Sequence, residues 1–211
     1  MKTILLHGLG QTPSSWDSTI QFLEQQSEII VPDLFSFIKG NPVNYESLYS
    51  AFAEYCIHFH EPLNLCGLSL GGILALRLAI EHPEVVHSLI LIGARYNVPK
   101  ILFKIQNGIF KLMPDQTFEQ MGMAKRDFIS LSESMTDIDL ENGLGCIQCR
   151  TLVICGEKDK ANKKASQVLQ KKISTAEICL VEKAGHEVNI DNPQKLALLI
   201  SNFVKQRENF R

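Results

Sequence analysis

The chain has 211 residues, of which 45% are hydrophobic and 21% charged, with a formal net charge of −2 at pH 7. This length suits one domain with a substantial core, or one domain carrying an insertion. The even scatter of charge excludes a basic face for nucleic acid, and the lack of a membrane-length apolar run or a signal-peptide pattern leads us to expect no membrane span and a cytoplasmic protein.

Short apolar runs alternate with amphipathic stretches through the first part of the chain. Residues 3–6 form an apolar run that ends at His7-Gly8-Leu9-Gly10, which predicts a buried strand. Thr12-Pro13 predicts the start of a helix, and residues 29–31 predict the next strand. Residues 45–59 carry apolar side chains at helical spacing. This alternation predicts a parallel sheet wrapped by helices.

The segment Gly67-Leu68-Ser69-Leu70-Gly71 stands between an apolar run and a helix-compatible stretch. A strand that reverses sharply into a helix needs small residues on both sides of the turn. The pattern G-x-S-x-G also occurs by chance in ordinary tight turns, but here both of its flanks fit the strand-turn-helix setting. We therefore interpret Ser69 as a nucleophile that stands above the carboxyl edge of the sheet.

Three further apolar runs predict buried strands at residues 88–92, 151–155 and 177–181. A lysine-rich helix is predicted over residues 162–173, and a last helix begins at Asn192-Pro193. The predicted fold class is therefore α/β, with a mostly parallel sheet of six strands flanked by helices.

Residues 95–145 interrupt this alternation with two amphipathic segments and no strand. An insertion at the carboxyl edge of the sheet is most simply a helical cap over the serine. We thus expect a core of residues 1–94 and 146–211 with a cap inserted between them. Ile101, Ile105 and Ile109 lie in a first cap helix that is apolar nearly all round, and they are expected either to line an acyl pocket or only to pack on the core.

A serine hydroxyl needs a base within about 3 Å and a third group that orients the base. Asp159 follows one predicted buried strand and His186 follows the next. The ends of neighbouring parallel strands meet at one edge, so Ser69, Asp159 and His186 are expected to converge there. Asp159 could instead cap the following helix, Glu157 is the rival carboxylate, and His186 could be an ordinary buried histidine.

Cys146 and Cys149 form a single C-x-x-C pair. With no second pair and no histidine at ligand spacing, a structural role is favoured over zinc binding. We expect no metal and no cofactor.

The chain resembles the α/β-hydrolase superfamily, in particular its small capped, carboxylesterase-like members. The resemblance rests on His7-Gly8, on the pentapeptide around Ser69, on Gly156-Glu157-Lys158-Asp159 and on Gly185-His186, in that order. It implies an oxyanion hole made by the backbone N–H groups of Leu9 and Leu70, with His7 bracing their loop. The extra N-terminal hairpin common in the family has no residues here, so we expect a smaller sheet with an exposed edge strand, in a monomer or a homodimer.

The resemblance also implies a serine hydrolase that cleaves carboxylic esters, and the apolar first cap helix favours short or medium apolar acyl groups. Thioesterase, lactonase, carbon–carbon hydrolase and menaquinone-pathway lyase chemistry on the same three residues stay open as alternatives. A ligand-binding receptor on a hydrolase scaffold is a further alternative, although a pure binder has no use for all three groups.

Overall fold

A computed structural model describes residues 1–24, 28–40 and 42–205 of the chain. Within these residues a six-stranded sheet has the order β2-β1-β3-β4-β5-β6, and every neighbouring pair is parallel. The strands are β1 (Thr3–Leu6), β2 (Ile29–Ile30), β3 (Leu63–Leu68), β4 (Val86–Ile92), β5 (Arg150–Gly156) and β6 (Ala176–Val181). The predicted α/β class with six strands is confirmed, and β2 and β6 form the two edges of the sheet.

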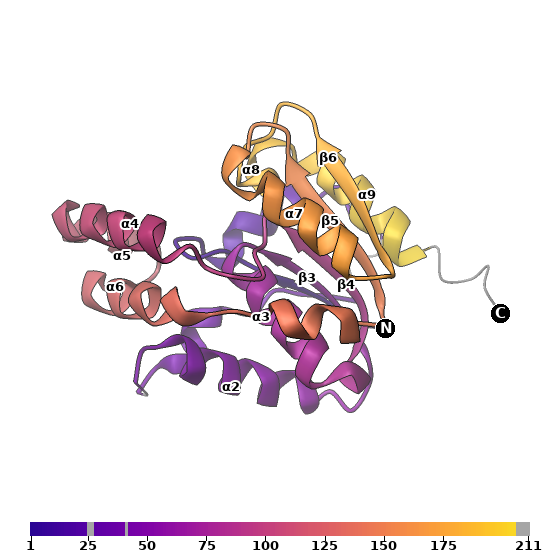
Figure 1. Cartoon of the computed structure of the whole chain (residues 1–211), viewed down its shortest axis with the longest axis horizontal. Coiled ribbons are helices and arrows are strands. Elements are labelled where there is room, and N and C mark those ends of the chain that lie inside the picture. Colours follow the sequence, from indigo (N-terminus) through magenta and orange to yellow (C-terminus); the bar gives the residue numbers. More distant parts are fainter. Residues whose placement is uncertain (25–27, 41, 206–211) are drawn as a thin grey trace.

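Helices cover both faces of this sheet (Figure 1). On one face lie α2 (Tyr45–Ile57), α3 (Leu70–Glu81) and α7 (Lys160–Lys172), and on the other α1 (Asp17–Ile20), α8 (Val188–Asp191) and α9 (Pro193–Lys205). The packing of strand β4 on both faces of the sheet explains why its sequence is continuously apolar. Leu89 and Leu91 pack with the first group of helices, whereas Ile90 and Ile92 pack with the second.

The connection from β3 to α3 is tight because two glycines let the backbones approach closely. A Cβ atom on Gly67 would lie 2.3 Å from the carbonyl carbon of Gly71, and one on Gly71 would lie 2.5 Å from the carbonyl oxygen of Leu6. Any side chain at these two positions would push α3 away from β1 and β3.

The segment between β4 and β5 contains α4 (Lys100–Leu112), α5 (Asp115–Gln120) and α6 (Lys125–Ser134). Figure 1 shows these three helices projecting beyond the sheet. The chain then returns through the 3-10 turns η5 (Met135–Asp137) and η6 (Glu141–Cys146). An isolated antiparallel bridge between Asn97 and Asp139 joins the two ends of the segment.

Several local expectations differ from the structure. The helix predicted at Thr12 is a 3-10 turn, η1 (Pro13–Trp16), followed by the single turn α1, and the Thr12 hydroxyl makes no capping bond. The helix predicted from residue 162 begins at Lys160, because Asp159 is its N-cap and accepts a bond from the Asn162 amide. Two further 3-10 turns are η3 (Leu34–Ile38) and η4 (Pro83–Val85).

Among the described residues, no helix has both the length and the apolar character needed to cross a bilayer.

Replacing Gly67 by Ala should lower the free energy of unfolding by roughly 1–3 kcal/mol, because its Cβ would overlap the backbone of α3. The matched control is Gly108→Ala in α4, where a Cβ meets no atom within 4 Å. That change should stabilise the protein by about 0.5–1 kcal/mol, since alanine favours a helix more than glycine does. Urea unfolding of both variants measures the difference, and equal effects would contradict the close-approach argument.

Candidate active site

Ser69 is held in an unusual backbone conformation between β3 and α3. Its φ is 52° and its ψ is −111°, a region that residues with a side chain rarely adopt. Two hydrogen bonds hold it there: its amide donates to the Ile92 carbonyl at 2.9 Å, and its carbonyl accepts from the Ile73 amide at 3.0 Å. The serine is thereby fixed at the carboxyl edge of the sheet, where it lines a cavity.

Asp159 and His186 meet at the same edge. Asp159 follows β5 and is buried, whereas the His186 side chain follows β6 and is 40% exposed. Oδ2 of Asp159 lies 2.8 Å from Nδ1 of His186. The two loops are held together by a hydrogen bond from the Lys158 amide to the Ala184 carbonyl. The pair is therefore positioned by neighbouring strands, as the sequence predicted.

Asn162 orients the Asp159 carboxylate, and sequence reasoning missed it. Its Nδ2 lies 2.8 Å from Oδ2 and 3.0 Å from Oδ1 of Asp159, and 3.1 Å from Nδ1 of His186. Nη1 of Arg95 donates to Oδ1 of Asn162 at 3.2 Å, which fixes the direction of the amide. Asp159 thus caps α7 and contacts His186 at once, so capping the helix does not prevent the contact with the imidazole.

The environment of Asp159 favours its ionised form. Burial by itself would raise the pKa of the carboxyl group, but the hydrogen bonds from His186 and Asn162 oppose burial and outweigh it. The pKa of Asp159 is therefore lowered. A buried carboxylate that stays ionised can hold an imidazole in one tautomer and stabilise its protonated form.

Gly93 is a second residue that the sequence analysis missed. It follows β4 with a φ of 53°, and a Cβ there would lie 2.9 Å from Nδ1 of His186 and 3.4 Å from Oδ2 of Asp159. A side chain at this position would therefore displace the imidazole. A glycine directly after a buried strand, at the predicted carboxyl edge, is the signal that could have indicated it.

A cavity of about 310 Å³ brings the three predicted residues together, since Ser69, Asp159 and His186 all line it. Most of its other walls are apolar and come from both the sheet edge and the α4–α6 segment: Leu9, Leu70, Ile73, Phe103, Phe110, Phe128 and Met135. Arg95 and Gln106 add polar groups. No hydrogen bond joins the Ser69 hydroxyl to His186 within the described chain. Such contacts are often long in free enzymes and tighten when substrate binds.

Ile101, Ile105 and Ile109 were expected either to line an acyl pocket or to pack on the core, and in the structure they do neither. Their exposed fractions are 77%, 60% and 56%, and the cavity is lined instead by Phe103, Gln106 and Phe110 of the same helix. Helix α4 is apolar on several sides, and its aromatic side faces inward because Phe110 packs edge-to-face on Phe128, with ring centroids 5.1 Å apart.

His7 braces the loop that carries Leu9. Its ring is fully buried, with Nδ1 3.0 Å from the Gly8 carbonyl and Nε2 accepting from the Leu34 amide at 3.1 Å. Because Nε2 is an acceptor, Nδ1 carries the proton and donates to Gly8, so the ring is neutral. Burial lowers the pKa of His7, despite the opposing effects of the Gly8 hydrogen bond and the Asp33 charge.

Gln11 connects this loop to the region after His186. Its Oε1 accepts from the Gly8 amide at 3.3 Å, and its Nε2 donates to Oε1 of Glu187 at 2.8 Å. Nothing in the local sequence pattern indicated this link, because the two residues are 176 positions apart.

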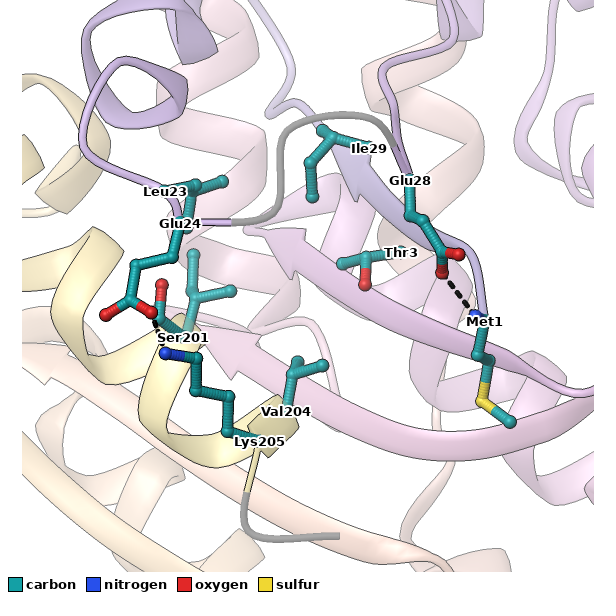
Figure 2. Close-up of a pocket in the computed structure, with 10 residues that line it drawn as sticks. Met1, Thr3, Leu23, Glu24, Glu28, Ile29, Ser201, Val204 and Lys205 are labelled. Atoms are coloured by element: carbon teal, nitrogen blue, oxygen red, sulfur yellow. Dashed lines mark hydrogen bonds and ion pairs between the residues drawn. The ribbon is translucent and has the colours of Figure 1, made fainter. Parts of the chain in front are cut away.

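A smaller pocket of about 40 Å³ lies at the opposite edge, where β1 and β2 begin (Figure 2). Ion pairs between the N-terminal amine and Glu28, and between Lys205 and Glu24, flank it. In open parallel sheets, ligands bind outside the carboxyl ends of the strands, so this pocket is not the candidate active site. All six cysteines are free thiols, and the described residues hold no group of three or more potential metal ligands.

Comparisons with known proteins relate the chain to a family of enzymes. The sequence profile described as "Alpha/beta hydrolase family" matches residues 3–197. The pimeloyl-[acyl-carrier protein] methyl ester esterase of Aeromonas hydrophila is 28% identical over 95% of this chain and 94% of that protein. The mouse monoacylglycerol lipase ABHD6 is 22% identical over 98% and 76%. The esterase EaEST from Exiguobacterium antarcticum shares the fold, with a TM-score of 0.82, 19% identity and coverage of 97% and 92%.

Acid should destabilise the protein partly through His7. Below its ordinary pKa of 6.5, the unfolded histidine takes up a proton that the folded one does not, so the free energy of unfolding falls as the pH drops. His7→Gln keeps an acceptor for Leu34 but cannot titrate. Between about pH 7.5 and about pH 5, wild type should lose more stability than this variant in urea unfolding. If the free energies of unfolding of the two proteins change in parallel with pH, His7 is not held in a buried neutral state.

Proposed function

The chain belongs to the alpha/beta hydrolase family and is a carboxylesterase-like enzyme, and we propose that Ser69, His186 and Asp159 are its catalytic triad. The observation that carries this proposal is the 2.8 Å contact between Asp159 and His186, at the rim of the cavity that Ser69 also lines. The backbone that presents the serine, the oriented imidazole and the ionised carboxylate are the three parts that acyl transfer through a serine requires.

In this mechanism, Nδ1 of His186 donates to Asp159, which leaves Nε2 free to accept the Ser69 proton. The Ser69 oxygen attacks the ester carbonyl and forms a tetrahedral intermediate. Its collapse breaks the bond to the alcohol, which leaves with the proton that His186 returns. Water then attacks the acyl-enzyme and gives its proton to His186. The second tetrahedral intermediate collapses to the carboxylic acid, and the Ser69 oxygen leaves with the proton that His186 returns.

The oxyanion hole of this proposal consists of the Leu9 and Leu70 amides. Leu70 is the first residue of α3, so its N–H is one of the four at a helix start that have no acceptor within the helix. Leu9 lines the same cavity, on the loop braced by His7 and Gln11. Each well-placed donor would lower the barrier by roughly 3–4 kcal/mol.

Residues 95–145 act as a cap in this proposal, over a core of residues 1–94 and 146–211. Phe103 and Phe110 of α4 and Phe128 of α6 contribute apolar walls to the cavity. These walls favour a small or medium apolar acyl group in the substrate. The names of two relatives, a methyl ester esterase and a monoacylglycerol lipase, also describe carboxylic esters as substrates.

Ser69→Ala should abolish turnover of p-nitrophenyl esters and labelling by a fluorophosphonate, because the acyl-enzyme can no longer form. The matched control is Ser18→Ala, since Ser18 is an exposed serine in α1 that does not line the cavity. This control should keep full activity and labelling. Esterase turnover that persists in a folded Ser69→Ala protein would overturn the assignment of the nucleophile.

Phe103→Ala should shift the preferred p-nitrophenyl ester toward longer acyl chains, because it removes an aromatic wall from the cavity. The effect on kcat/KM for one substrate relative to another should be roughly 10-fold or more. Ile105→Ala, on the exposed side of the same helix, should leave the chain-length profile unchanged. Identical chain-length profiles for the two variants would contradict the proposal that α4 lines the acyl site.

A further inference from the structure

Helix α4 exposes a continuous row of large aliphatic side chains. Ile101, Ile105, Ile109 and Leu112 are 77%, 60%, 56% and 87% exposed. Their spacing of four, four and three residues places them on one side of the helix, and we call this row the outer stripe. Figure 1 shows α4 in the part of the chain that projects farthest from the sheet. A contiguous apolar patch on a protein surface indicates a site that binds another protein, a membrane or a ligand.

The other side of α4 is already occupied, so the helix cannot rotate to bury the outer stripe. Phe110 packs edge-to-face on Phe118 and Phe128, with ring centroids 6.3 and 5.1 Å away. Asn107 is buried and accepts a hydrogen bond of 2.6 Å from the Ser132 hydroxyl. Rotation would break this bond, expose the phenylalanine and dismantle one wall of the cavity.

The charges of α4 indicate which partner suits the outer stripe. The helix carries Lys100, Lys104 and Lys111 and no acidic residue. These lysines form a second row, one position before Ile101, Ile105 and Leu112. Two of them also reach carboxylates at the base of the segment, since Lys100 pairs with Asp137 at 2.7 Å and Lys111 with Glu133 at 2.8 Å.

We propose that α4 binds flat on an anionic lipid surface, with the outer stripe in the apolar layer and the lysine row at the headgroups. An amphipathic helix with an aliphatic side and a lysine-rich border binds such a surface through apolar burial and attraction to anionic headgroups. Lysine stems extend along apolar surface while their ammonium groups reach the headgroups. A second copy packed stripe to stripe in the antiparallel direction would bring the two like-charged lysine rows close to each other, which disfavours that pairing.

This placement gives the two sides of one helix connected roles. The outer stripe would touch the lipid, while Phe103 and Phe110 on the other side line the cavity beside Ser69. The enzyme would then work next to the apolar phase from which an ester with an acyl chain is drawn. That last step rests on the proposed function, whereas binding to the surface does not.

Flotation with vesicles tests the proposal on the full chain. Wild type should float with vesicles of phosphatidylcholine and phosphatidylglycerol in equal parts, and much less with pure phosphatidylcholine. The double variant Ile105→Ser with Ile109→Ser should bind at least about 10-fold more weakly, since it removes buried apolar groups. Lys104→Gln should weaken binding to the anionic vesicles roughly 5-fold, and high salt should act in the same direction.

The matched control is Leu198→Ser, which removes a 49% exposed leucine from α9 and should leave flotation unchanged. Circular dichroism checks that each variant folds, and turnover of a soluble short-chain ester should be equal in all of them. If wild type does not turn over the soluble ester at all, that result counts against the proposed function and not against lipid binding. Absence of wild-type flotation, an equal loss in Leu198→Ser, or a dimer that the double variant dissociates would overturn the lipid proposal.

Discussion

The close packing of α3 against β1 and β3 is the constraint on which the candidate site depends. With no side chain at Gly67 or Gly71, the first turn of α3 lies almost against the two strands. The chain can make this reversal only if the residue at the corner adopts a positive φ, and Ser69 occupies that corner. The strain at one residue is balanced by two backbone hydrogen bonds and a packed core around it. The Ser69 hydroxyl thus stands between rigid elements and not on a loop.

Around this fixed point, polar contacts between distant loops position the other groups. Arg95 orients Asn162, Asn162 orients Asp159, and Asp159 contacts His186. Gln11 joins the His7 loop to Glu187, directly after His186. Apart from the exposed Glu187, each of these side chains is partly or fully buried, so an unpaired partner would be costly and the bonds reinforce one geometry.

The α4–α6 segment has one side that faces the cavity and another that is exposed on the surface of the molecule. Its inner side is an aromatic cluster that closes part of the cavity, and its outer side is aliphatic and bordered by lysines. A helix that is apolar on both sides is unusual for a surface element that contacts only water. Two different apolar environments, a substrate cavity and a lipid surface, would account for both sides.

The six parallel strands and the meeting of Ser69, Asp159 and His186 at one edge of the sheet were predictable from the sequence. Continuous apolar runs mark strands buried on both faces, and parallel strands bring the residues that follow them to one edge. The sequence could not decide which side of α4 faces inward, because isoleucine and phenylalanine alternate around that helix and both are apolar. Only packing against Phe118 and Phe128 selected the phenylalanines. The contacts of Asn162 and Gln11 likewise join segments far apart in the chain, which no local pattern encodes.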